Sequence, residues 1–188
     1  MPLPPIEPDI GERQTLDEIR DWHLGMVEAL VDQRAAVLRA VQNATPVAAR
    51  FVGMNQDGLD AYFDTQRQEL DRLTMLNLVA SAEASIKDDY FHRVRRKLKD
   101  KLSRAYQKWY KGLPLAKKRR PDFGEGGILD VLKIVNVVDK HIVGKYRECL
   151  RPRHWVGRGR NWGTPVELDR LDPDDVYERC IALLCALP

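Results

Sequence analysis

Apolar residues recur at alternating intervals of three and four over two long stretches, and this spacing restricts the fold more than any other feature. It places side chains on one face of an α-helix. The first stretch predicts a helix from about residue 16 to residue 40, with a face of Leu16, Ile19, His23, Met26, Leu30, Gln33, Val37 and Ala40. The second predicts a helix from about Leu59 into the nineties, with a face of Leu59, Phe63, Leu70, Leu73, Leu76 and Ala80.

Shorter helices are marked by their ends. Thr15 and Glu18 form a capping box before the first long helix. Asp172 followed by Pro173 begins the last helix. Another helix begins near Ile128 and carries its apolar set as far as Ile142, whereas residues 117–121 read as an exposed loop. No stretch alternates convincingly with a period of two, so we expect an all-α antiparallel bundle of two long and about three shorter helices.

Length and composition set the class of protein. A chain of 188 residues with 44% hydrophobic and 31% charged residues fits one globular domain. We expect an extended, proline-rich tail over residues 1–14 and a single helical domain over residues 15–188. No apolar run approaches the ~20 residues of a membrane span, and the N-terminus lacks a secretory signal. Three cysteines without a CxxC pair favour a cytoplasmic location and reduced core thiols.

Basic residues gather in two blocks. Residues 93–120 hold thirteen Lys and Arg and one acid, and residues 145–160 hold six and one. Acids outnumber bases in the rest of the chain, so the charge favours a localised anionic partner. The alternative for the first block is a solvated basic helix. The candidate RNA contacts in this block are Arg93, Arg95, Arg96, Lys97, Lys117, Lys118, Arg119 and Arg120.

The common nucleotide and metal motifs are missing from the sequence. There is no GxxxxGK[ST] loop, no GxGxxG after a strand, no HExxH and no Cys/His pair at zinc spacing. The four histidines are scattered. We therefore expect no metal and no cofactor, and any chemistry is expected to be metal-independent.

The second basic block contains the densest cluster of candidate functional residues. RPRHWVGRGRNWG, residues 151–163, combines four arginines, one histidine and two tryptophans. Arginine suits a phosphodiester because its planar fork is permanently charged. A histidine moves protons near neutral pH. RNA supplies its own nucleophile, the 2′-hydroxyl, so a few such groups suffice.

This stretch resembles the active-site motif of HEPN domains, small all-α domains of prokaryotic defence and toxin–antitoxin systems. The family motif is an Arg, a polar residue, a short spacer and a His, and one bacterial subgroup reads like R-H-W-[VL]-A-H-G-R-Y-W. Residues 153–157 and 159–162 are similar to it. Residues 83–86 with Asp88 and Asp89, and residues 126–130, are similar to upstream segments of the same subgroup. The resemblance spans about residues 70 to 180.

The resemblance implies catalytic positions at Arg153, His154 and Arg158, with Arg160 in support. It has one major departure, because Arg158 stands where the family has its histidine. An arginine is a poor proton acceptor at neutral pH. A second register, with Arg147 and His154 as the motif pair, leaves His154 in the histidine position but loses the flanking matches.

Glu83 and the two tryptophans have two interpretations each, and the glycines have a structural one. Glu83 continues the apolar face of the second helix, where a bare carboxylate is unfavourable. It either reaches water at the rim or holds an arginine of another helix. Trp155 and Trp162 are packing anchors or base-stacking platforms. Gly157 allows close helix contact, and Gly159 ends the helix.

Three functions compete. The first is a HEPN-like, RNA-associated protein of bacterial stress or phage defence, a homodimer, with metal-independent endoribonuclease activity if its degenerate site is active. The second is a non-catalytic helical module that binds a protein partner, such as an acidic antitoxin or a complex subunit. The third is a DNA-binding regulator, for which no convincing recognition helix is found.

Overall fold

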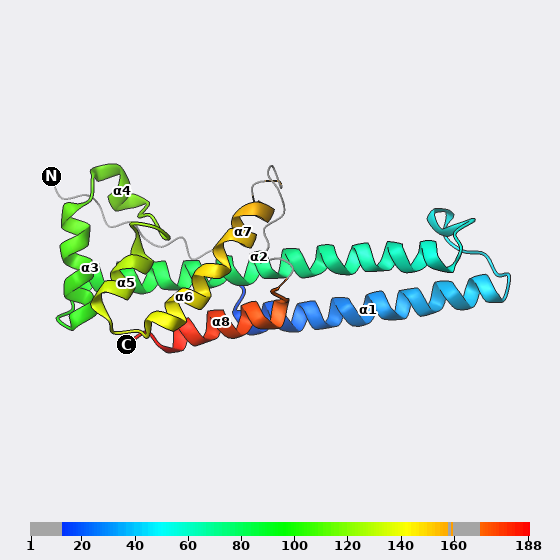
Figure 1. Cartoon of the computed structure of the whole chain (residues 1–188), viewed down its shortest axis with the longest axis horizontal. Coiled ribbons are helices and arrows are strands. Elements are labelled where there is room, and N and C mark those ends of the chain that lie inside the picture. Colours follow the sequence, from blue (N-terminus) through cyan, green and yellow to red (C-terminus); the bar gives the residue numbers. More distant parts are fainter. Residues whose placement is uncertain (1–12, 158, 160–169) are drawn as a thin grey trace.

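Two long antiparallel helices form the frame of the computed structural model (Figure 1). They are α1 (Leu16–Gln42) and α2 (Gln56–Arg96), joined through the short 3-10 helix η1 (Ala49–Phe51). The structure describes residues 13–157, 159 and 170–188, with only the backbone of Arg119. Within these ranges every regular element is helical, which confirms the predicted all-α class.

Local capping fixes where the long helices begin. Thr15 accepts a hydrogen bond from the Glu18 N–H, and the Glu18 carboxylate accepts one from the Thr15 N–H, as predicted for a capping box. Asn55 accepts from the Gly58 N–H at the start of α2. Lys97 ends α2 in the left-handed conformation, with φ of 51°. Arg13 and Gln14, which the sequence placed in the tail, contact Asp88 and Ser81 of α2.

Six shorter helices gather around one end of α2. They are α3 (Lys101–Gly112), α4 (Leu115–Arg119), α5 (Ile128–Val135), α6 (Lys140–Glu148), α7 (Leu150–Gly157) and α8 (Pro173–Cys185). The rest of α1 and α2 protrudes from them as a two-helix arm (Figure 1). Helix α8 begins at the predicted Asp172 cap, with Pro173 in its first turn.

Two predicted boundaries are wrong. Residues 115–119 form the helix α4 rather than a loop. The single helix expected from Ile128 to Ile142 is divided, because Asn136 adopts the left-handed conformation with φ of 54° and ends α5. Asn tolerates that conformation better than most residues, since its short amide bonds to the local backbone.

The apolar core is divided unequally along the molecule. The main core surrounds the C-terminal half of α2 and includes Ala82, Ile86, Tyr90, Leu132 and Leu183, each fully buried. A small second cluster holds the tip of the arm together and consists of Val37, Phe51, Leu59 and Phe63. The domain therefore has a well-packed body and a thinly packed arm.

The predicted buried faces of the two long helices are confirmed only in part. Leu16, Ile19, His23 and Val37 of α1 are buried as expected, as are Leu59, Phe63 and Leu70 of α2. Ala80 is exposed although it lies within the body. Toward the arm, Met26 and Leu73 are each 40% exposed, and Gln33 is also exposed. Over this length each long helix packs mainly against the other, so the buried stripe is narrower than in a full bundle. None of the helices within the described residues is long and apolar enough to cross a membrane.

Candidate functional site

Glu83 and Arg153 meet where α7 packs against α2. Arg153 Nη2 lies 3.0 Å from Glu83 Oε2, and Lys87 Nζ lies 2.6 Å from Glu83 Oε1. The Glu83 residue is only 8% exposed. This confirms that Glu83 holds an arginine of another helix rather than pointing to water from the rim. One carboxylate shared between two cations fixes both and leaves one net positive charge at this point.

His154 lies at the same place. It lines a pocket of about 360 Å³ together with Glu83, Lys87, Pro121, Asp122, Phe123, Gly124, Glu125 and Leu150. The fold thus brings Arg153, His154 and Glu83 together, although Glu83 is seventy residues distant from the other two in sequence. The Arg153 Nε is buried without a hydrogen-bond partner in the described part of the chain.

The charged residues that line this pocket are mostly acidic. Asp122 and Glu125 both line it, and Lys117 Nζ pairs with Asp122 at 2.6 Å. With Glu83, the lining has three carboxylates and the single cation Lys87. The lining therefore carries more negative than positive charge, and Arg153 is not part of it but reaches the pocket through its ion pair with Glu83.

A second arginine of the motif region is held in the same way. Arg147, on α6, donates from Nη2 to Oδ1 of Asp130 on α5, and Asp130 Oδ2 accepts from the Gly126 N–H at 2.5 Å. The hydrogen bond from Arg147 is the main cause that lowers the pKa of Asp130. Both upstream segments that resemble the HEPN subgroup therefore supply a carboxylate to an arginine: Glu83 to Arg153, and Asp130 to Arg147.

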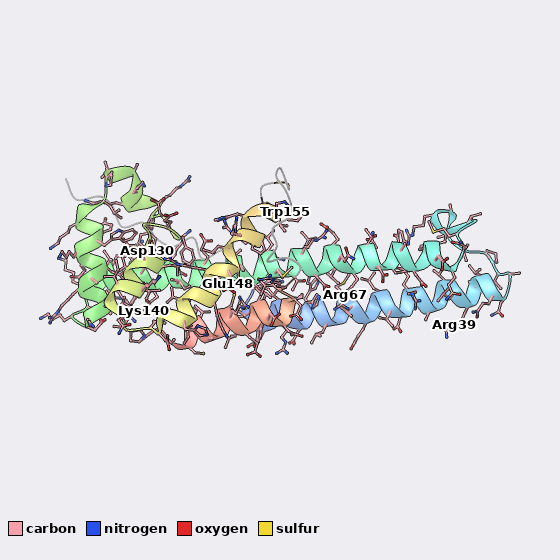
Figure 2. All side chains as sticks on the ribbon, viewed as in Figure 1. Arg39, Arg67, Asp130, Lys140, Glu148 and Trp155 are labelled. Atoms are coloured by element: carbon pink, nitrogen blue, oxygen red, sulfur yellow. The ribbon has the colours of Figure 1, made fainter. Side chains whose placement is uncertain are left out.

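Trp155 is a packing residue, which settles its two interpretations. It is 6% exposed, and the Arg72 guanidinium carbon lies 5.9 Å from its ring centroid. Figure 2 shows Trp155 on α7. Gly159 has φ of +73° just beyond α7, as expected for a helix end. A Cβ on Gly157 would meet Leu76 at an ordinary 3.6 Å, so close contact does not require glycine there. The predicted site residues Arg158 and Arg160, and Trp162, lie outside the described residues.

Arg93 does not belong to an exposed basic surface. It is 6% exposed and donates to Asp89, Asp100, Ser103 and the carbonyl oxygen of Pro188. These contacts tie α2, α3 and the end of α8 together. The predicted RNA contact at Arg93 is corrected on this basis, because its guanidinium is buried and already occupied.

The other predicted RNA contacts lie in two groups. Arg95, Arg96 and Lys97 are exposed at the C-terminal end of α2, with Arg95 packed over Phe91 at 5.5 Å. Around α4, Lys117 pairs with Asp122 and Lys118 lies 5.3 Å from the ring centroid of Tyr110. Arg120 is exposed, whereas the side chain of Arg119 is outside the described residues.

The sequence analysis missed a basic stripe within the same block. Lys101, Arg104, Lys108 and Lys111 are all exposed on α3 and follow intervals of three and four, so they share one face. None of them forms an ion pair with an acid in the part of the chain that is described. Their helical spacing was the signal that could have found them.

The described thiols and acids are the remaining candidates for a further site. Burial raises the pKa of Cys149 to about 11, so this thiol is inert near neutral pH. Among the described residues, no three His, Cys, Asp or Glu side chains are grouped so as to hold a metal ion. Comparison with family models, curated proteins and solved structures finds no match to this chain.

Proposed function

We propose that this protein is an RNA-associated protein of the HEPN type, in which Arg153 and His154 face an RNA phosphodiester. The observation that carries the proposal is that Glu83 pairs with Arg153 and also lines the same pocket as His154. The equivalent pairing of Asp130 with Arg147 supports it, because both acids come from segments that carry the family resemblance.

Each residue has a distinct role in this proposal. Arg153 binds a phosphate oxygen through a charge-assisted hydrogen bond, and Glu83 positions its guanidinium. His154 handles the proton. Arg158 and Arg160 contribute further positive charge. The exposed cations Arg95, Arg96, Lys97 and Arg120 attract the RNA backbone, a contribution that weakens with salt.

The reaction open to these groups is metal-independent transesterification. The 2′-oxygen of the RNA attacks the adjacent phosphorus while His154 accepts its proton. The bond from phosphorus to the 5′-oxygen breaks, and the 5′-oxygen takes up a proton from water, to which His154 returns the proton that it accepted. The products are a 2′,3′-cyclic phosphate and a 5′-hydroxyl. Without the family histidine at position 158, His154 is the only described group of the site suited to move that proton near neutral pH.

The biological setting rests on the resemblance alone. The proposal includes a homodimer, a bacterial stress or phage-defence role in the cytoplasm, and control by an antitoxin or complex subunit. The RNA contact of Arg153 and His154 can be tested without assuming the dimer, the biological setting or the control.

The test is incubation of end-labelled structured RNA with the purified chain in EDTA, beside Arg153→Ala, His154→Ala and the control Arg39→Ala on the arm. Cleavage that leaves cyclic phosphate, is lost in the first two variants and is kept in the control is the result expected of an active enzyme. RNA binding without cleavage, weakened only in Arg153→Ala, would assign a binding role. Absence of both binding and cleavage would refute the proposal.

A further inference from the structure

An apolar groove lies between α3 and α5, on elements apart from the pocket beside His154. It has a volume of about 530 Å³ and is lined by Ala105, Lys108, Trp109, Gly112, Leu113, Val131, Ile134 and Val135. Ile134 is 81% exposed, which is the highest exposed fraction of any large apolar residue in the described part of the chain. A groove of this size with an apolar lining and an exposed isoleucine is typical of a binding surface.

The basic stripe of α3 runs along one edge of this groove. The groove-facing residues Ala105, Trp109 and Gly112 follow one helical face, and Lys108 belongs both to that face and to the stripe of Lys101, Arg104, Lys108 and Lys111. The occupant must therefore offer apolar side chains to the floor and negative charge to the edge.

We propose that this groove binds an acidic amphipathic helix of another protein. Two helices form its walls, and a helix that lays its apolar face in such a groove is a recurrent mode of recognition. Acidic residues flanking that face would pair with Lys108 and the rest of the stripe. The proposal goes beyond the RNA function and does not depend on it.

Other occupants fit the groove less well. RNA would pair with the stripe but leave the apolar floor and Ile134 uncovered. A second copy of this chain in a two-fold contact would bring the same cationic stripe against itself, since such contacts use the same patch on both subunits. Like charges placed together across an interface disfavour binding.

The probe is a labelled 15-residue helical peptide with leucines along one face and glutamates flanking them, titrated onto the full chain by fluorescence anisotropy. The control peptide has the same composition with its leucines spread around the helix. We expect saturable binding of the first peptide, weakened by added salt. Ile134→Asp and Lys108→Glu should each weaken it about tenfold or more, equivalent to about 1.4 kcal/mol.

Matched variants guard against unfolding. Val31→Asp is the control for Ile134→Asp, because Val31 is also a β-branched apolar residue and is 61% exposed on the arm. Arg39→Glu is the control for Lys108→Glu, because it reverses the charge of an exposed residue on the arm. Both should bind the peptide as the unaltered chain does, and all four variants should keep the helical circular dichroism. Ile134 is largely outside the core, so its substitution is expected to leave the fold intact.

Four results would overturn the proposal. Equal binding of the control peptide would show that binding does not depend on an apolar helical face. Unchanged binding in Ile134→Asp would show that the peptide does not bind in the groove. Binding that appears only after residues 1–12 are deleted would assign the groove to the chain's own segment. Self-association that Ile134→Asp abolishes would assign it to a second copy.

Discussion

At the scale of single residues, the buried charges of this protein hold helices together. Arg93 joins α2 to α3 and to the end of α8, and Glu83 joins α2 to α7. Removing one partner of such a group leaves an uncompensated charge, which costs more than the pair itself contributes. The candidate site is thus built on contacts that also serve stability, and its variants must be checked for folding.

Gly127 is required for a different reason. A Cβ at this position would lie 2.2 Å from the carbonyl oxygen of Asp122, a contact with backbone that cannot move aside easily. We expect Gly127→Ala to lower the free energy of unfolding by about 1–3 kcal/mol. The control is Gly144→Ala inside α6, where a Cβ meets nothing within 4 Å. Alanine there should stabilise the helix by up to about 1 kcal/mol. Urea unfolding of both variants checks this, and equal effects would contradict it.

Asp130 makes stability depend on pH. Its pKa is lowered in the folded chain, chiefly by the hydrogen bond from Arg147. Its contribution is therefore fully present above the unfolded pKa of about 4 and is lost as the pH falls toward the folded value. Asp130→Asn should be less stable than the unaltered chain at pH 7, and the difference should shrink below about pH 4. Urea unfolding at pH 7 and pH 3 measures it, with the exposed Asp64→Asn as a control. A difference that stays constant would refute the assignment.

At the scale of elements, the sequence predicted the helices better than their junctions. Periodicity and capping located α1, α2 and α8, because those signals are local. The end of α5 at Asn136 was missed, since a left-handed residue other than glycine leaves little trace in the sequence. The sequence also could not show which arginine pairs with Glu83, because the contact spans seventy residues and depends on how α7 packs. Arg93 was misassigned because charge alone does not show which face of a helix is buried.

The arm should open more readily than the body. Only the small cluster of Val37, Phe51, Leu59 and Phe63 holds its tip, whereas the main core surrounds the C-terminal half of α2. Local opening is easier where few apolar contacts protect the backbone. We expect amides of residues 26–66 to exchange with deuterium faster than those of residues 75–93 of the same helix pair. Mass spectrometry of exchanged peptides measures this, and uniform protection along α2 would contradict it.

At the scale of the whole molecule, the protein combines a helical body, a protruding arm and two separate candidate surfaces. The pocket beside His154 is formed by α2, α7 and the segment before α5, and the apolar groove lies between α3 and α5. The proposed RNA surface and the proposed protein-binding groove are therefore formed by different residues. Substitutions at one surface should therefore leave binding at the other unchanged.

The central claim is that Arg153, held by Glu83, contacts RNA. The most direct measurement is the affinity of a fluorescent structured RNA for the unaltered chain, Arg153→Ala and the arm control Arg39→Ala at low salt. Loss of one charge-assisted hydrogen bond to phosphate is expected to weaken binding about tenfold or more. We expect that loss in Arg153→Ala and an unchanged affinity in Arg39→Ala. Equal affinity of all three proteins, with Arg153→Ala still folded, would contradict it.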